Sequence, residues 1–309
     1  MKNFIKWHLR WTVRPIIKEL KYFRQLSFYL LTRKKVSEKP AIKQYKEGRQ
    51  PNYERPVCLF CSYDKESIIE ENVYYYLNEL KLAGFDIIFI STSDTILDAD
   101  LEKLSSYCIR IMNRENRGYD FYGWKTALEN YPQYKLHTGL LLANDSVLGP
   151  LFDISGIIAR LENSEADIIG MTNSFQFYPH LQSYFLYCKK NVVLSEEFTR
   201  FFQKVEVLEL KIAIIRKYEV GFSRLLGRRF RIMALYDLRQ LVTRVGYYEK
   251  PIKWVNPFFF WKPLITEFKF PFLKKSLLAS KKVRDRGEIP TILAGYTNYD
   301  LDMLKIRAP

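Results

Sequence analysis

The residues best suited to chemistry are Asn144, Asp145 and Ser146, which follow the apolar run at residues 140–143. Such a run predicts a buried strand that delivers polar groups at its carboxyl end, where open α/β sheets bind ligands. A carboxylate there is costly unless it is paired, hydrogen-bonded or bound to a cation. Mg²⁺ takes oxygen ligands and bridges carboxylates to phosphates, so Asp145 could hold a metal ion against a diphosphate. Asn144 and Ser146 could then hydrogen-bond a sugar; a turn or a helix cap is the structural alternative.

A second candidate is the glycine-bearing run at residues 116–124, which predicts a loop that turns into a helix. Gly118 and Gly123 allow the backbone to approach a ligand closely. Arg117 could meet a phosphate with its forked donors, whereas Asp120 could simply cap the following helix. The spacing is neither GxGxxG nor a P-loop, which argues against a Rossmann dehydrogenase and a Walker NTPase.

Two further side chains could act on an acceptor molecule. His180 follows a proline in a polar loop and could orient an acceptor or ligate a metal, although a lone histidine is more often structural. Glu219 stands at a predicted helix break and could be the general base that deprotonates a sugar hydroxyl. An exposed carboxylate at a helix end is an equally good interpretation of Glu219.

These candidates need a sheet to position them, and the apolar pattern predicts one from residue 55 onward. We expect strands at residues 57–62, 86–91, 108–112, 139–143, 167–172 and 182–188. We expect helices at residues 68–83, 99–106, 121–130, 154–161, 195–204, 207–218 and 220–226. Strands alternating with helices imply an α/β fold with a mostly parallel sheet covered on both faces.

The charge of the chain is concentrated at its N-terminus. The net charge is +15, and residues 1–49 carry +11 of it. Basic residues recur at helical spacing over residues 2–21, beside an apolar stripe, which is typical of a helix lying on an anionic membrane surface. A solvated arm that packs on its own domain is the alternative, and Pro15 should kink such a helix or begin a second one. Residues 32–55 predict a linker, and the nearly neutral remainder argues against a nucleic-acid partner.

Cysteine usage and hydropathy indicate the cellular compartment. Cys58 and Cys61 have a CxxC spacing, but they lie in an apolar strand with no second pair, so we expect buried, inert thiols. This usage fits a reducing compartment. We find no signal-peptide pattern and no uncharged apolar run of about 18 residues, which predicts a cytoplasmic catalytic body.

Several motifs in one order resemble the rhamnan synthesis protein F family of bacterial cell-surface polysaccharide glycosyltransferases. They lie at residues 62–64, 91–92, 116–125, 144–151, 180–185, 218–221 and 256–274. The pattern is more distantly similar to inverting GT-A glycosyltransferases, in which the first strand ends hold the nucleotide and an Asp-x-Asp-like motif holds a metal. The resemblance implies a GT-A-like (Rossmann-like) fold.

The resemblance also implies roles for individual residues. The donor would lie against Ser62, Tyr63, Ser91, Asn116, Arg117, Gly118, Asp120, Asn144 and Ser146. Asp145 would hold Mg²⁺ or Mn²⁺ as the last residue of the metal motif, whose first acidic position is Ala143 here. The base would be Glu219, Asp64 or His180, and the acceptor side would include Gln182, Tyr184 and Trp124.

We therefore predict a membrane-associated glycosyltransferase that transfers L-rhamnose from dTDP-rhamnose to a lipid-linked glycan with inversion. Residues 1–49 would form a membrane-associating arm and linker, residues 50–250 the catalytic domain, and residues 251–309 a C-terminal appendage. The enzyme would sit peripherally on the inner face of the cell membrane. The alternative, motivated by Ala143, is a non-catalytic assembly or sugar-binding protein that keeps the fold.

Overall fold

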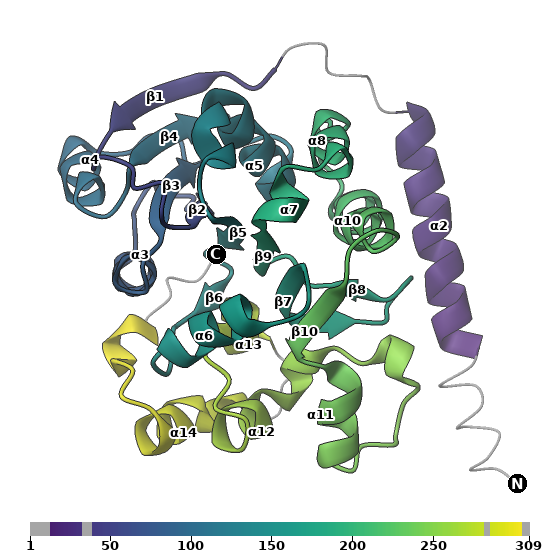
Figure 1. Cartoon of the computed structure of the whole chain (residues 1–309). Coiled ribbons are helices and arrows are strands. Elements are labelled where there is room, and N and C mark those ends of the chain that lie inside the picture. Colours follow the sequence, from purple (N-terminus) through teal and green to yellow (C-terminus); the bar gives the residue numbers. More distant parts are fainter. Residues whose placement is uncertain (1–12, 33–38, 281–284, 305–309) are drawn as a thin grey trace, which may run out of the picture.

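A central nine-stranded sheet organises the part of the chain that the computed structural model describes, which is residues 13–32, 39–280 and 285–304. The strand order is β1-β4-β3-β2-β5-β9-β7-β10, and β8 pairs with β7 (Figure 1). The strands are β1 (Ile42–Glu47), β2 (Val57–Ser62), β3 (Asp86–Ser91), β4 (Arg110–Arg114), β5 (Gly139–Asn144), β7 (Ile168–Ser174), β8 (His180–Leu181), β9 (Phe185–Lys189) and β10 (Ile232–Tyr236). A separate two-stranded ladder joins β6 (Val147–Leu148) to β11 (Leu273–Lys274).

The four strands β4, β3, β2 and β5 are mutually parallel, which explains the apolar runs in the interiors of β2, β3 and β5. Every residue of β2, β3 and β5 is buried, as expected for parallel strands covered by helices on both faces. β9 runs antiparallel to its neighbours β5 and β7, and β10 runs parallel to β7. The predicted α/β class, with a mostly parallel sheet flanked by helices, is confirmed.

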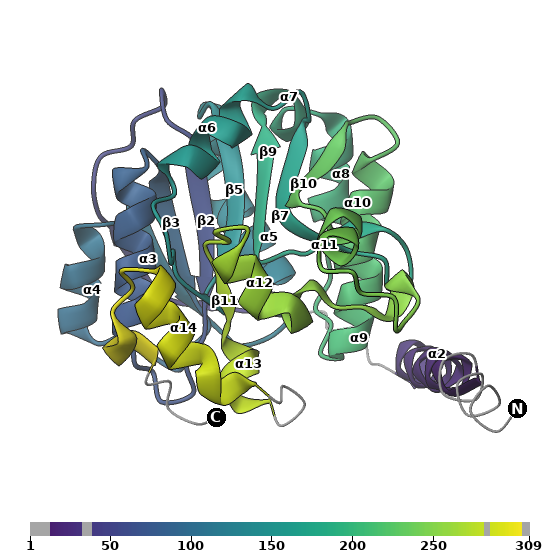
Figure 2. The same cartoon turned by 90° about the horizontal axis from the view of Figure 1, so that it is seen from below.

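Two hydrophobic cores cover the two faces of the sheet (Figure 2). The first core contains residues of α3 (Glu71–Leu82), α4 (Asp98–Ser105), α6 (Ser155–Asn163), α11 (Leu238–Arg244), α12 (Trp261–Thr266), α13 (Lys275–Ala279) and α14 (Ile289–Tyr296). The second contains residues of α5 (Tyr119–Asn130), α7 (Lys190–Val193), α8 (Glu196–Gln203), α9 (Lys211–Ile214) and α10 (Val220–Leu226). Short 3₁₀ turns lie at Pro132–Lys135, Ile252–Trp254, Pro257–Phe260, Arg286–Glu288 and Leu301–Leu304.

Three sequence predictions need correction. The predicted linker at residues 32–55 contains β1, an edge strand antiparallel to β4, which is polar because only one of its edges is paired. The predicted helix break at Glu219 is instead a π-helical turn, Ile215–Glu219, that joins α9 to α10. Residues after 250 do not form a loose appendage, because Phe258, Trp261 and Phe272 belong to the first core.

The N-terminal helix α2 (Arg14–Thr32) lies at one side of the molecule, next to α9 and α10 (Figure 1). Leu26 and Tyr29 pack against the second core, and the Tyr29 hydroxyl accepts a hydrogen bond of 2.8 Å from the backbone N–H of Glu209. Pro15 lies in the first turn of α2, where proline is tolerated, which agrees with the prediction that it begins a helix. Residues 1–12 of the predicted interfacial helix lie outside the described residues.

All four cysteines are free and buried, which confirms the prediction made for Cys58 and Cys61. Burial raises the pKa of each thiol of Cys58, Cys61, Cys108 and Cys188 above its usual value, so these thiols are unreactive. Among the described residues, no helix is both long and apolar enough to span a membrane.

Candidate active site

The polar residues at the ends of the parallel strands lie at one edge of the sheet. The strand register aligns Ser62 with Ser91 and Ser91 with Asn113, and it places Cys61 beside Asn144. Asp145 follows β5 directly, and its backbone N–H donates to the Cys61 carbonyl at 3.1 Å. The predicted convergence of strand ends is therefore present in the structure.

Asp145 joins the ends of β2 and β5. Its Oδ2 accepts hydrogen bonds from the Ser62 hydroxyl at 2.8 Å and from the backbone N–H of Tyr63 at 3.1 Å. These bonds fix the carboxylate and order the start of the loop that leaves β2. The Oδ1 atom has no hydrogen-bond partner among the described residues, so it is available to a ligand.

The turn into α5 brings Asp120 to the same place. Gly118 has a φ of +83°, a left-handed conformation that glycine adopts without strain. The Asn144 side-chain amide donates to Asp120 Oδ2 at 2.9 Å, and Asn144 Oδ1 accepts from the Ser146 hydroxyl at 2.5 Å. Burial, followed by the nearby charge of Asp145, raises the pKa of Asp120 from its usual 3.8 to about 6.

This raised pKa gives a testable pH dependence. Below about pH 4 Asp120 is protonated in both the folded and the unfolded chain. Between about pH 4 and pH 6 it ionises in the unfolded chain but stays protonated in the folded chain. This group therefore reduces stability above pH 6. We expect Asp120→Asn, which keeps the bond from Asn144, to melt higher than wild type at pH 7.5 and to lose this advantage below about pH 4. Thermal melts across that range test the expectation, and a constant difference between the two proteins would contradict it.

A lysine from the C-terminal segment completes this cluster. The β6–β11 ladder pairs Lys274 with Val147, and the Lys274 ammonium donates to the Ser146 hydroxyl at 2.6 Å. Burial lowers the pKa of Lys274 from 10.5 to about 8, and the charges of Glu219, Asp120 and Asp145 oppose this shift. The sequence prediction included residues 271–274 only as part of a motif and gave Lys274 no role.

Glu219 approaches the cluster from the π-helical turn. Its Oε1 accepts a hydrogen bond of 2.7 Å from the backbone N–H of Ser183. Single π turns within helices are frequent at functional sites. The structure therefore brings Asp145, Asp120, Ser146, Lys274 and Glu219 together, from four separate parts of the chain, and all five residues are partly exposed.

The other two candidates for the base have structural partners. Asp64 Oδ1 accepts hydrogen bonds from the backbone N–H groups of Glu66 and Ile68, at 2.8 and 3.1 Å, and so closes the loop after β2. His180 is buried in β8, where its Nδ1 lies 2.7 Å from the Tyr178 carbonyl. Of the three candidates, Glu219 is the one whose charge acts on Lys274 in the cluster, so it is the best candidate for the base.

The predicted acceptor side is wrong for Trp124. This side chain is 0% exposed, and its indole donates to the Leu59 carbonyl at 3.1 Å, so it is buried in the core against the sheet. Tyr184 is also buried, beneath Lys274, and its hydroxyl lies 2.8 Å from that of Thr172. The Thr172 hydroxyl also bonds the amide oxygen of Gln182, which is half-buried.

The loop at residues 115–119 is held by Arg114, a buried residue that the sequence prediction missed. The Arg114 guanidinium donates to the carbonyls of Glu115, Arg117 and Tyr119 at 2.6 to 2.8 Å. Arg117 itself is half-buried, and its Nε lies 4.0 Å from Glu209 Oε1. Asn116 is exposed in the same loop. Arg114 is thus a positioning residue for the predicted donor loop.

The described residues of the site offer few ligands to a divalent cation. Among the described residues, no group of three or more His, Cys, Asp or Glu side chains is arranged to hold a metal ion. Ala143 replaces the first acid of the expected motif, and its side chain is buried in the first core. A cation is already present beside Asp145, since the Lys274 ammonium is bonded to Ser146.

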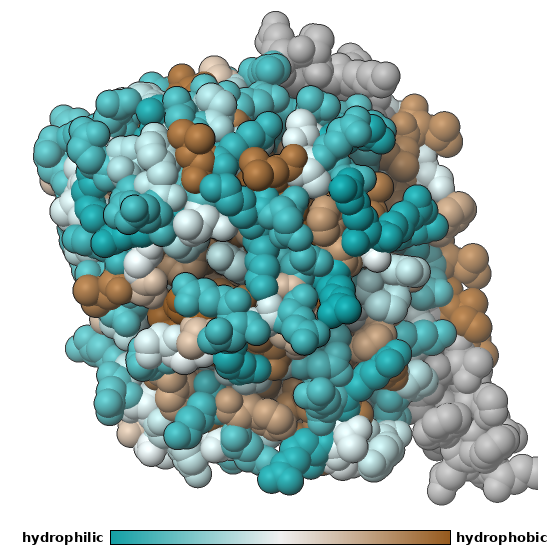
Figure 3. All heavy atoms as spheres, in the orientation of Figure 1, coloured by the Kyte–Doolittle hydropathy of each residue, from teal (hydrophilic) through white to brown (hydrophobic). Residues whose placement is uncertain are grey.

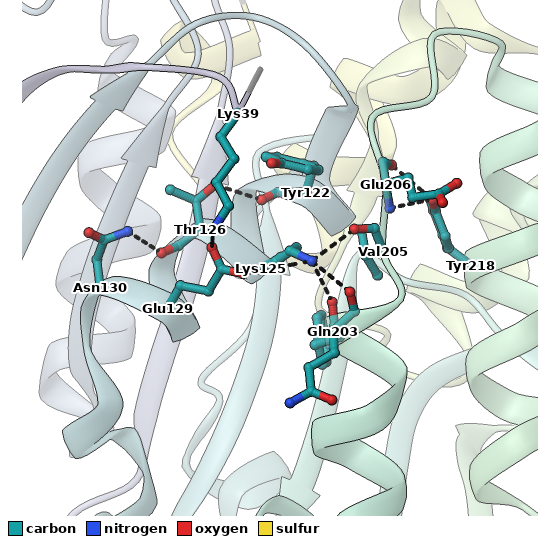
Figure 4. A network of polar contacts seen from close by, with 11 residues as sticks. Lys39, Tyr122, Lys125, Thr126, Glu129, Asn130, Gln203, Val205, Glu206 and Tyr218 are labelled. Carbon is teal, nitrogen blue, oxygen red and sulfur yellow. Dashed lines mark hydrogen bonds and ion pairs between the residues drawn. The ribbon is translucent and has the colours of Figure 1, made fainter. Parts of the chain in front are cut away.

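Lys125, a buried lysine of α5, stabilises the chain segment that leads to Glu219 (Figure 4). The Lys125 ammonium donates to the carbonyls of Phe202, Gln203 and Val205 at 2.8 to 3.2 Å, and it thereby caps the C-terminal end of α8. The Tyr218 hydroxyl accepts from the Glu206 N–H and donates to the Glu206 carbonyl, both at 2.8 Å. These contacts tie α5 to the segment that leads to Glu219.

Replacing this lysine should destabilise the protein strongly. Lys125→Met leaves carbonyl groups buried without partners, which we expect to lower the free energy of unfolding by about 2–3 kcal/mol. Lys39→Met is the matched control, because Glu129, which lies 3.7 Å from the Lys125 ammonium, also bonds Lys39 at 3.2 Å, and Lys39 is exposed. Such surface pairs contribute at most about 1 kcal/mol. Urea unfolding of both variants measures the difference, and equal losses would contradict the assigned role.

Comparison with known protein families identifies the family of this chain. Residues 87–307 match the family described as Rhamnan synthesis protein F, so the chain belongs to this family. The uncharacterized protein y4gN of Sinorhizobium fredii is 30% identical over 198 residues, covering 62% of this chain. The chain spans about half the length of this curated relative.

Several solved structures have a similar arrangement of sheet and helices, at low sequence identity. The mannosyltransferase PcManGT from Pyrobaculum calidifontis, in complex with GDP-Man and Mn²⁺, is 9% identical with a TM-score of 0.40, covering 74% of this chain and 64% of that one. The glycosyltransferase GlyE of Streptococcus pneumoniae TIGR4 is 10% identical with a TM-score of 0.39, covering 81% and 63%. A putative glucose-1-phosphate thymidylyltransferase from Bacillus anthracis is 8% identical with a TM-score of 0.39, covering 65% and 96%.

Proposed function

We propose that this chain transfers a sugar from a nucleotide-sugar donor to a glycan acceptor by direct displacement with inversion. The observation that carries the proposal is the cluster of Asp145, Asp120, Ser146, Lys274 and Glu219 at the carboxyl end of a parallel sheet. Ligands of open α/β sheets bind at that edge. The cluster offers both acids and a cation, which a reaction with an anionic leaving group needs.

The proposed roles follow the order of the strand ends along the sheet. The nucleoside would lie against the ends of β2 and β3, near Ser62, Tyr63 and Ser91, and Tyr63 is exposed there. The diphosphate would lie over Ser146, beside the Asp145 loop. Glu219 would take the proton of the acceptor hydroxyl, since a general base must be within hydrogen-bond reach of that proton. No step is assigned to Mg²⁺ or Mn²⁺, which remains a prediction with Asp145 as its single carboxylate ligand.

We further propose dTDP-rhamnose as the donor and a lipid-linked glycan as the acceptor, on the family's description as rhamnan synthesis proteins. A panel of dTDP-rhamnose, UDP-hexoses and GDP-sugars, with lipid-linked acceptor, tests this by nucleotide release and product analysis. Selective turnover of dTDP-rhamnose would support the proposal, and turnover of another donor would change only the sugar. Failure of every donor to bind or react would favour the non-catalytic alternative.

We also propose that α2 holds the enzyme on the anionic inner face of the cell membrane. Ile17, Leu20 and Phe23 are each about 60% exposed on its outer side, and Leu31 is 86% exposed. Figure 3 shows apolar residues along this helix at the edge of the molecule. Exposed Lys21 and Arg24 lie between them. A helix with apolar and basic residues on one exposed surface is suited to an anionic lipid surface.

Vesicle binding tests this membrane proposal. We expect the chain to sediment with anionic vesicles and not with zwitterionic ones, and Leu20→Asp with Phe23→Asp to abolish sedimentation. Leu82→Asp is the matched control, because Leu82 is 72% exposed on the distant helix α3. Unchanged sedimentation of the double variant would overturn the proposal, and steeply salt-dependent binding to DNA or RNA would favour a nucleic-acid partner instead.

A further inference from the structure

Lys274 is placed by the fold where a phosphate-bearing ligand would carry its charge. The β6–β11 ladder holds its backbone, and the backbone N–H of the next residue, Lys275, donates to the Ser146 carbonyl at 3.1 Å. The Lys274 ammonium bonds the Ser146 hydroxyl and lies 5.5 Å from the Tyr184 ring centroid and 5.7 Å from that of Phe258. Both rings belong to the first core, so the ammonium lies against buried aromatic side chains.

The charges around Lys274 explain how it is tolerated there. Asp120, Asp145 and Glu219 all favour its protonated form, against the opposing effects of burial and of Lys211. The same ammonium lowers the cost of ionising Asp120. A cation half-buried among three carboxylates is stable without a ligand, and its ammonium remains partly exposed to one.

The metal motif is altered at the same place. Ala143 pairs with Phe60 and Phe185 in the sheet, and it is 0% exposed in the first core. A carboxylate at this position would be buried among apolar side chains and would not reach the ligand edge without disturbing them. The chain therefore has one acid fewer in the motif and one lysine more beside it.

We propose that Lys274 supplies the positive charge that holds the donor's diphosphate, so that donor binding needs no divalent cation. This inference rests on the proposed function. In the transfer, the acceptor oxygen forms a bond to the anomeric carbon and gives its proton to Glu219. The bond from that carbon to the diphosphate oxygen breaks, and its electron pair remains on the diphosphate, against the Lys274 ammonium. Lysine acts on phosphates in this way as a point charge.

Calorimetric titration of the full chain with dTDP, UDP and GDP, in EDTA and separately in MgCl₂, tests the proposal. We expect the best of these ligands to bind with the same affinity, within about threefold, in both solutions. Lys274→Met should weaken binding about tenfold to a hundredfold, the loss expected for a charge-assisted hydrogen bond. Lys274→Arg should retain most of the affinity, because it keeps the charge.

Lys275→Met is the matched control, since it removes the next lysine along the chain, at the start of α13, and it should bind as wild type does. Thermal melts establish that each variant is folded, and Lys274→Arg keeps the test decisive should Lys274→Met not fold. Binding that is lost in EDTA and restored by MgCl₂, or unchanged binding by Lys274→Met, would overturn the role of Lys274 while leaving a donor site. Absence of binding in both solutions would overturn the proposed function together with this inference.

Discussion

Replacing Glu219 by glutamine is expected to lower turnover by about two to four orders of magnitude, the usual contribution of a general base. Glutamine keeps an oxygen that can accept the 2.7 Å hydrogen bond from the Ser183 N–H, so the π-helical turn should stay in place. Only the ability to take a proton is removed. Nucleotide release in the presence of acceptor measures the loss, and titration with nucleoside diphosphate should show binding close to that of wild type.

The control for this substitution is Glu165→Gln. Glu165 is an exposed carboxylate that pairs with Arg231 before the start of β7, at the end of that strand opposite to its carboxyl end. We expect its turnover and melting temperature to match those of wild type. Should Glu219→Gln keep turnover within about tenfold of wild type, Glu219 is not the base. Asp64 and His180 would then have to be reconsidered despite their backbone partners.

The sequence predicted the centre of the sheet well because parallel strands leave a strong pattern. β2 and β3 were predicted with their observed bounds, since six consecutive buried positions read as an uninterrupted apolar run. Ser62, at the end of β2, and Asp145, directly after β5, lie in hydrogen-bond contact in the structure. The carboxyl ends of parallel strands meet at one edge, so sequence order alone implies this proximity.

What the sequence left out depends on contacts between distant segments. Lys274 reaches Ser146 through a two-residue ladder across 128 positions, and two residues carry no periodic signal. β1 is polar because it is an edge strand, and polar runs resemble linkers. The π turn before Glu219 changes the spacing of apolar residues along the helix. In the sequence this change looks like the end of one helix and the start of another.

Buried charged residues were a further source of error, because composition places them at the surface. Arg114 is 0% exposed, and its donors satisfy the carbonyls of the loop that leads into α5. Trp124 shows the converse, since an aromatic residue inside a recognised motif proved to be core. A motif shows that residues belong together, but burial decides which of them can contact a ligand.

Replacing Asp145 by asparagine is expected to reduce turnover by at least about a hundredfold, because it removes a fixed charge from the centre of the cluster. Asparagine can still accept the bonds from Ser62 and Tyr63, so the strand ends should remain joined. The charge of Asp145 also raises the pKa of Lys274, which stands at about 8. Without that charge the pKa of Lys274 falls further, and the ammonium loses its proton at a lower pH.

This coupling gives the Asp145 prediction a second measurement that a purely structural role would not affect. Nucleotide release by wild type should decline as pH rises through about 8, when Lys274 loses its charge, and the decline in Asp145→Asn should begin at lower pH. Asp98→Asn, an exposed carboxylate in the first turn of α4, should leave both rate and profile unchanged. Full turnover by Asp145→Asn would remove Asp145 from the active site. If turnover falls but the pH dependence of nucleotide release does not shift, Asp145 contributes to the rate independently of Lys274.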